Sequence, residues 1–246
     1  MGRKAVILVF WLAAGMLFLE AETLHYRITS PLMGTLGTIT IDKKVGKKSY
    51  RIDAGVRTQG IASMLTGKRR EHYRSEGSVE GGLLKSHHLR LERRSSKKRQ
   101  IDDYRFDPTH RKVMKSRVRW KKEHLDQNNS KTLPYFTRED ILTLYFNNIG
   151  KILRSPEKRH WEILAVGAEK IKGKIVIDRL EGETAKKARE DLDVKPGTPV
   201  LVFYSPQKIA GKRNRRFTVA VDDHGLPLRI RFVAIPVVGE IFVERK

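Results

Sequence analysis

Apolar and polar positions alternate with a period of two along much of the chain after residue 37. Runs such as Thr38–Ile41 and Tyr50–Val56 place an apolar side chain at every second position, which is typical of strands with one buried face. The same pattern predicts further strands at 88–92, 101–106, 113–120, 174–179, 200–204, 216–221, 228–233 and 240–244. Because Arg or Lys often occupies the positions between, we expect an antiparallel sheet with one packed face and one wet, cationic face.

Glycine, proline and aspartate mark the turns between these strands. The connection Asp222–Gly225 suits a hairpin that has Gly at a positive φ, and Pro227 then begins the next strand, where a missing N–H is tolerated. Gly34 and Gly37 bracket a turn or bulge in which a side chain would clash. These motifs predict features of the fold and carry no chemistry of their own.

One segment has helical spacing instead. Thr137 and Asp140 form an approximate capping box before an apolar series, which predicts an amphipathic helix over Arg138–Asn148. The polar segment Glu183–Asp191 fits a second helix and a solvated loop equally well. The fold class is therefore mainly β: a large curved antiparallel sheet, or a half-open β-barrel or sandwich, with one packed amphipathic helix. A helix over the mouth of such a sheet could enclose an apolar ligand.

The first 21 residues have the order of a secretory signal peptide. Arg3 and Lys4 precede an uninterrupted apolar run from Ala5 to Leu19, and a stretch with small residues follows, with a cleavage position after Ala21. The run is shorter than the roughly 20 residues of a membrane-spanning helix. An uncleaved inner-membrane anchor through residues 5–19 and a buried N-terminal helix remain as alternatives. We expect export to the periplasm and a single β-rich domain over residues 22–246.

Composition places a strong positive charge on that domain. The 246 residues include 51 Lys and Arg against 28 Asp and Glu, for a formal net charge of +23, and no cysteine. The absence of cysteine excludes disulfide frameworks, thiol nucleophiles, cysteine-based zinc sites and lipid attachment through a cysteine. The signal segment contributes only Arg3, Lys4 and Glu20 to the charge, so the excess of cations belongs to the folded part.

An ordered set of short motifs runs through the chain: Tyr26–Ile28, Gly34–Gly37, Tyr50–Ala54, Thr58–Gly60, Glu71–Gly77, Gly81–His88, Asp140–Phe146 and Asp222–Ile230. From about Tyr26 to Val243, this order resembles the bacterial exported family catalogued as the domain of unknown function numbered 3108. The resemblance implies an exported, β-rich envelope protein of a Gram-negative-type bacterium. It brings no activity and no catalytic residues. The dense basic stretch Arg93–Arg99 departs from the family pattern.

Candidate catalytic groups are sparse. His87 and His88 are adjacent, and on a strand they would point to opposite faces and could not readily share one metal ion. The same alternation separates Asp102 from Asp103, and a turn accounts for Asp222-Asp223. No nucleophile elbow, phosphate-binding loop or dinucleotide fingerprint occurs. We expect no enzyme activity, cofactor or metal, although carboxylates from distant strands could still converge as in a glycosidase.

Three basic runs beside predicted strand ends are the candidate ligand-binding residues: Lys68, Arg69, Arg70, Arg93, Arg94, Lys97, Lys98, Arg99, Lys212, Arg213, Arg215 and Arg216. They fit solvated hairpin loops that keep sheet edges charged, or a cationic surface for anionic lipid, lipopolysaccharide or cell-wall polymer. The export signal argues against nucleic acid. We predict a non-enzymatic envelope protein that binds an amphipathic or anionic component through a curved sheet and basic rims. A protein-binding scaffold is the alternative, and a weak hydrolase comes third.

Overall fold

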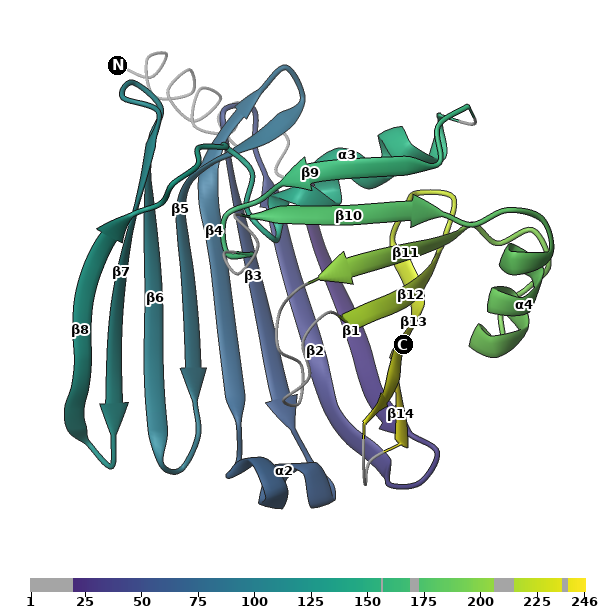
Figure 1. Cartoon of the computed structure of the whole chain (residues 1–246), viewed down its shortest axis with the longest axis horizontal. Coiled ribbons are helices and arrows are strands. Elements are labelled where there is room, and N and C mark those ends of the chain that lie inside the picture. Colours follow the sequence, from purple (N-terminus) through teal and green to yellow (C-terminus); the bar gives the residue numbers. More distant parts are fainter. Residues whose placement is uncertain (1–19, 156, 169–172, 206–214, 236–238) are drawn as a thin grey trace, which may run out of the picture.

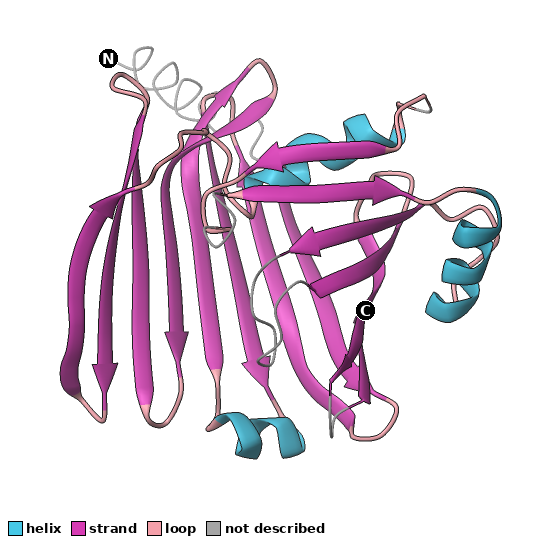
Figure 2. Ribbon diagram, viewed as in Figure 1, coloured by secondary structure: helices cyan, strands magenta, loops and turns pink. Residues whose placement is uncertain are grey.

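A computed structural model describes residues 20–155, 157–168, 173–205, 215–235 and 239–246. Most of this chain is strand (Figure 1; Figure 2). The strands, in chain order, are β1 Glu20–Ser30, β2 Gly34–Val45, β3 Ser49–Thr58, β4 Arg70–Glu80, β5 Leu83–Arg94, β6 Lys98–Asp107, β7 Lys112–Lys121, β8 His124–Thr132, β9 His160–Leu164, β10 Lys174–Arg179, β11 Val200–Ser205, β12 Arg215–Val221, β13 Pro227–Ile235 and β14 Gly239–Arg245.

All these strands belong to one 14-stranded antiparallel sheet in the order β8-β7-β6-β5-β4-β3-β2-β1-β14-β13-β12-β11-β10-β9. Two meanders, β1–β8 and β9–β14, are therefore joined where the first strand pairs with the last, with Ile28 opposite Val243. The sheet does not close, since β8 and β9 stand at its two ends. The predicted fold class, a large curved antiparallel sheet with a packed helix, is confirmed.

The alternation of buried and exposed positions explains the strands that the sequence predicts. In β3, Tyr50, Ile52 and Ala54 are buried while Arg51 is exposed, so one face packs and the other is wet, as expected. Strands β1, β4, β8 and β9 have no predicted counterpart. The hydrophobic alternation does not predict β4, because the fully buried, inward-facing residue of this strand is a serine, Ser75. The pattern does not predict β8 either, because this strand is almost entirely polar and is exposed along nearly its whole length.

Three helices accompany the sheet: α2 Gly60–Thr66, α3 Thr143–Leu153 and α4 Gly182–Leu192. The predicted helix over Arg138–Asn148 begins and ends five residues too early, because residues before Asp140 are held in extended hydrogen bonds, such as Ser86 N–H to the carbonyl of Arg138. The segment Glu183–Asp191 is helical, within α4, and packs through Ala185 and Leu192. Helix α2 has no predicted counterpart. None of the helices within the described ranges has the length and apolar character to cross a membrane.

Two predicted backbone features are present. Leu36 is an extra residue between Thr35 and Gly37 in the β1–β2 ladder, and a Cβ on Gly37 would lie 2.3 Å from the carbonyl oxygen of Arg57. The β12–β13 hairpin uses a left-handed glycine, since Gly225 has a φ of +81°, and Pro227 begins β13 as expected. The predicted signal peptide lies outside the described residues except for Glu20 and Ala21, which already pair with β2.

Candidate functional site

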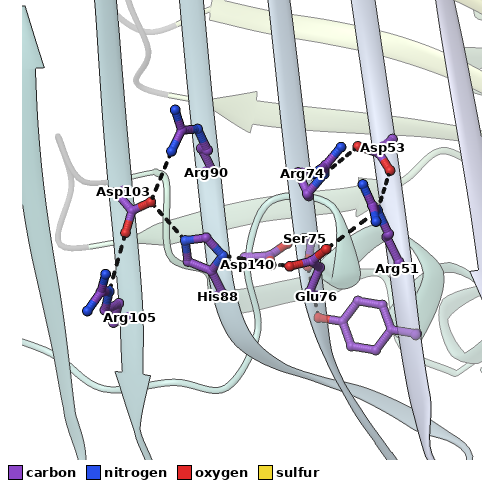
Figure 3. Close-up of polar contacts among 11 residues, drawn as sticks. Arg51, Asp53, Arg74, Ser75, Glu76, His88, Arg90, Asp103, Arg105 and Asp140 are labelled. Atoms are coloured by element: carbon purple, nitrogen blue, oxygen red, sulfur yellow. Dashed lines mark hydrogen bonds and ion pairs between the residues drawn. The ribbon is translucent and has the colours of Figure 1, made fainter.

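Helix α3 is fixed over the sheet by one buried carboxyl group. Asp140 is fully buried; its Oδ1 accepts the backbone N–H groups of Leu142 and Thr143, and its Oδ2 accepts the hydroxyls of Ser75 at 2.5 Å and Ser86 at 2.8 Å. Figure 3 shows Asp140 beside Ser75. The Tyr50 hydroxyl completes the cluster, 2.8 Å from Ser75 Oγ. Burial raises the pKa of Asp140, while the hydrogen bonds it accepts oppose that rise. The cluster therefore joins the start of α3 to β3, β4 and β5.

An apolar cavity of about 370 Å³ lies beneath α3. It is within the size range of small-molecule sites. Its wall combines both meanders and the start of α3: Leu24, Tyr26, Ile41, Ile141, Leu142, Leu144, Tyr145, Phe146, Ile175, Phe203, Phe217, Val219, Pro227 and Ile230. Because residues from β1–β2 and from β10–β13 line one space, the sheet must curl around it. The structure thus has a partly open apolar cavity beneath α3. That this cavity holds an apolar ligand stays a prediction.

A stack of aromatic rings, of which Tyr145, Phe203 and Phe217 line the cavity, forms one side of this space. Tyr145 stacks on Phe203 with ring centroids 6.5 Å apart, Phe203 on Phe217 at 5.1 Å, and Phe217 on Phe232 at 5.3 Å. Offset stacking of this kind adds about 0.5–1.5 kcal/mol per pair beyond simple burial. The stack gives β11, β12 and β13 a rigid apolar surface toward α3.

The cavity wall holds one unsatisfied polar group. Tyr26 is 2% exposed, and its hydroxyl has no hydrogen-bond partner among the described residues. Burial raises the pKa of Tyr26 to about 12, with the Arg245 guanidinium opposing the rise. The hydroxyl therefore stays protonated and can donate to an acceptor. Tyr145, in contrast, donates to the carbonyl of Gly225 at 2.5 Å.

A polar cleft of about 410 Å³ adjoins the cavity. Tyr145 and Phe146 line both spaces, so their rings stand between them. On the cleft side, the Lys43 ammonium lies 5.1 Å from the centre of the Phe146 ring and 2.8 Å from the Glu22 carboxylate. His224 also lines the cleft. An apolar space and a polar space thus meet at α3.

Two of the three predicted basic runs come together. Lys68 and Arg69 lie in the turn after α2 and Arg70 begins β4, while Ser96 in the β5–β6 turn donates its N–H to the carbonyl of Gly67 at 2.7 Å. Arg94, Lys97, Lys98 and Arg99 surround a hollow of about 280 Å³ with Trp120 and Lys122. Lys121 and Lys122 extend the cluster, although they are not among the predicted residues. This concentration of cations lies at the end of the sheet opposite α3 (Figure 1).

The remaining predicted residues lie elsewhere. Arg93 lies on the packed face of the sheet, 3.1 Å from Asp102 and over the ring of Tyr73. Arg216 lines a separate cleft beside α4. Arg215 begins β12. Lys212 and Arg213 lie outside the described residues. That these cations bind an anionic partner stays a prediction.

The acidic and histidine candidates separate across the sheet. Asp102 is buried, and although burial acts to raise its pKa, hydrogen bonding from Arg117 and the charges of Lys115 and Arg117 hold the pKa below its usual value. Asp103 lies on the other face, 2.8 Å from His88 (Figure 3). His87 is an extra residue in β5, between Ser86 and His88 in the pairing with β4. The described residues contain no group of three or more acidic and histidine side chains placed to hold a metal ion.

The cavity residues have only a weak signature in the sequence. Alternation indicates that Ile41, Val219 and Ile230 face inward, but nothing local shows that β1 pairs with β14. That pairing brings Leu24 and Tyr26 next to the second meander. The cavity is therefore a product of long-range topology.

The curled open antiparallel sheet resembles the fold of a β-barrel-like protein. A crystal structure titled as a beta-barrel-like protein of domain of unknown function DUF1849, from Brucella abortus, is similar, with a TM-score of 0.53 and 8% identity over 93% of this chain and 96% of that chain. This likeness concerns the fold alone. The family described as "Protein of unknown function (DUF3108)" matches residues 23–245, so the chain belongs to that family, and the resemblance seen in the sequence is confirmed. No curated protein matches the chain.

Proposed function

We propose that this protein binds an amphipathic molecule, with the apolar part in the cavity beneath α3 and the polar part toward the adjoining cleft. The observation that carries the proposal is the cavity of about 370 Å³, whose wall is formed by aliphatic and aromatic side chains, a proline and Tyr26. A space of this kind favours an apolar guest over water, because water would find few hydrogen-bond partners.

The residues that line the cavity favour a binding protein over an enzyme. Histidine–carboxylate pairs do occur, as in His88 with Asp103, but these two residues lie on the outer face among Arg90 and Arg105 and line neither the cavity nor the cleft (Figure 3). Two tyrosines, Tyr26 and Tyr145, line the cavity; burial raises the pKa of both, and the Tyr145 hydroxyl already donates to the carbonyl of Gly225. We therefore propose a non-enzymatic carrier or sensor, exported to the periplasm through residues 1–21.

Binding of two fluorescent probes tests the cavity: uncharged N-phenyl-1-naphthylamine and the carboxylate cis-parinaric acid. Ile41→Trp places a bulky indole ring in the cavity. It is expected to lower the affinity for both probes at least about tenfold, because the ring occupies the space of the guest. Ile101→Trp makes the same change on β6, away from the cavity, and is expected to leave both affinities unchanged. Equal effects of the two variants, or no binding by the wild-type chain, would overturn the proposal.

Tyr26→Phe examines the polar handle without changing the shape of the wall. Loss of one hydrogen bond from the hydroxyl is expected to lower the affinity for cis-parinaric acid about 5–10-fold and to leave the affinity for N-phenyl-1-naphthylamine unchanged. The substitution removes an unsatisfied buried group, so the variant should fold at least as well as the wild type. Parallel losses for both probes would show that the hydroxyl does not contact the guest.

A further inference from the structure

The end of the sheet opposite α3 exposes apolar and cationic side chains together. We call it the turn end, and it comprises the β1–β2 turn at 31–33, helix α2, and the turns at 95–97 and 122–123. Of the eight large apolar side chains that the described residues expose, five lie here or directly beside it: Leu32, Ile61, Met64, Leu65 and Leu125. Met64 is 76% exposed and Leu32 is 75% exposed.

Helix α2 is unusual in that none of its residues is buried. It is nevertheless held in place at both ends: Gln59 N–H donates to the carbonyl of Leu36 at 2.8 Å, and Gly67 accepts the N–H of Ser96. Lys122 N–H donates to the carbonyl of Lys97 at 3.0 Å, which links the next turn. Helix α2 and the turns at 95–97 and 122–123 are therefore linked in one edge, with exposed apolar side chains on α2 and beside the last turn.

Strand register aligns arginines behind this edge. Arg57 is opposite Arg70, Arg70 is opposite Arg94, and Arg94 is opposite Arg99, on four consecutive strands. Opposed residues on neighbouring strands share a face and are about 4.8 Å apart. We call these four residues the arginine row. Trp120 continues it on β7, with the Arg99 guanidinium 5.2 Å from the centre of its ring.

Within the described residues, most of the arginine row is not neutralised by an acidic partner. Arg99 forms an ion pair with Glu92 at 2.8 Å. Arg57, Arg70 and Arg94 are exposed and form no ion pair with another described residue. Like charges directly opposite one another oppose sheet formation, so the row is an arrangement that an external anionic surface would stabilise.

We propose that the turn end docks on an anionic phospholipid bilayer. Arginines and lysines would contact the head groups, while Met64, Leu65 and Leu125 enter the boundary between head groups and acyl chains. A linear series of cations behind projecting apolar side chains matches a planar surface that is anionic outside and apolar beneath. A soluble polyanion would engage the cations but would leave the apolar side chains in water. This inference does not require a guest in the cavity.

The absence of native cysteine allows a local test with the full chain. Met64→Cys and Met114→Cys each receive an environment-sensitive nitrobenzoxadiazole label; Met114 is 57% exposed and lies toward the other end of the long strands, as a matched control. With vesicles of phosphatidylcholine and phosphatidylglycerol, we expect a blue shift and a rise in emission at position 64 and little change at 114. With phosphatidylcholine alone, neither label should respond.

Two sets of substitutions separate the contribution of the arginine row to vesicle binding from that of the exposed apolar side chains. Arg57→Gln, Arg70→Gln and Arg94→Gln together are expected to weaken vesicle binding about 100-fold at low salt, since each cation near the membrane contributes to affinity. Arg105→Gln, Lys112→Gln and Lys131→Gln remove the same charge elsewhere and should have a much smaller effect. Met64→Asp with Leu65→Asp should also abolish the response to vesicles while leaving heparin binding intact. Equal responses of both labels, equal effects of the two triple variants, or vesicle binding unchanged by the aspartates would overturn the proposal.

Discussion

The long strands β3–β6 end in two contrasting ways. At the α3 end, a helix covers the sheet and buries Leu144, Ile149 and Ile152. Charged groups nearby on the outer face are paired, as in Arg74 with Asp53 and His88 with Asp103 (Figure 3). At the turn end, α2 buries no residue, and three of the four arginines in the row form no ion pair with any residue that the structure describes.

This contrast distinguishes structural from functional use of the same residue types. Buried apolar side chains and paired charges at the α3 end stabilise the folded state, and the apolar side chains also line the cavity. Exposed apolar side chains and opposed arginines at the turn end contribute little or act against stability. Substitutions at the two ends should therefore have different consequences, and each of the following measurements tests that difference.

The largest expected effect is at Asp140, which fixes the start of α3. Asp140→Ala leaves the Ser75 and Ser86 hydroxyls and two backbone N–H groups without their acceptor, and is expected to lower the free energy of unfolding by about 3–4 kcal/mol. Asp140→Asn retains an acceptor oxygen and should cost about 1–2 kcal/mol. Urea unfolding followed by circular dichroism measures both values.

Asp126→Ala is the matched control, because Asp126 is one-third exposed and pairs with the surface residue Arg119 at 2.5 Å. It should change the free energy of unfolding by less than about 0.5 kcal/mol. If Asp140→Ala were no more destabilising than this control, the α3 end would not depend on the buried carboxyl group.

How far the sequence predicts this molecule depends on the distance between the interacting residues. Alternation over five to ten residues identifies the faces of β3, β5 and β7. The start of α3 is harder to predict from the sequence, because Thr137 and Asp140 both fit the beginning of a helix. The residues before Asp140 pair with β5, and this long-range contact places the start of the helix after Asp140. The cavity and the arginine row depend on strand partners far apart in the chain, so composition indicates many cations but not their alignment.

A smaller effect, of opposite sign at the two ends, is expected from replacing arginine by threonine. Arg94→Thr removes like-charge repulsion from Arg70 and Arg99 and introduces a residue suited to strands. It should raise the free energy of unfolding by about 0.5–1 kcal/mol at low salt. Arg74→Thr removes the partner of Asp53 at 2.7 Å and should lower it by about 0.5 kcal/mol.

The salt dependence of unfolding provides a further check on the variants Arg94→Thr and Arg74→Thr. Screening shortens the reach of exposed charges to about 3 Å at 1 M ionic strength, so the gain from Arg94→Thr should shrink at high salt. Thermal or urea unfolding at low and high salt gives the comparison. A loss of stability in Arg94→Thr comparable to that in Arg74→Thr would show that the arginine row is structural, and the contrast between the two ends would fail.

The smallest expected effect is the pH dependence of the pair His88–Asp103 on the outer face. The hydrogen bond with Asp103 raises the pKa of His88 above 6.5, with burial and Arg105 opposing and Glu76 assisting. The pair's contribution is therefore fully present below pH 6.5 and is lost as the pH rises through the folded-state pKa. Since both side chains are partly exposed, we expect a few tenths of a kcal/mol. The difference in unfolding free energy between wild type and His88→Gln should be larger at pH 6 than at pH 8.5, and Asp103→Asn should remove most of that difference. A difference that grew with pH would contradict the stabilising role of protonated His88.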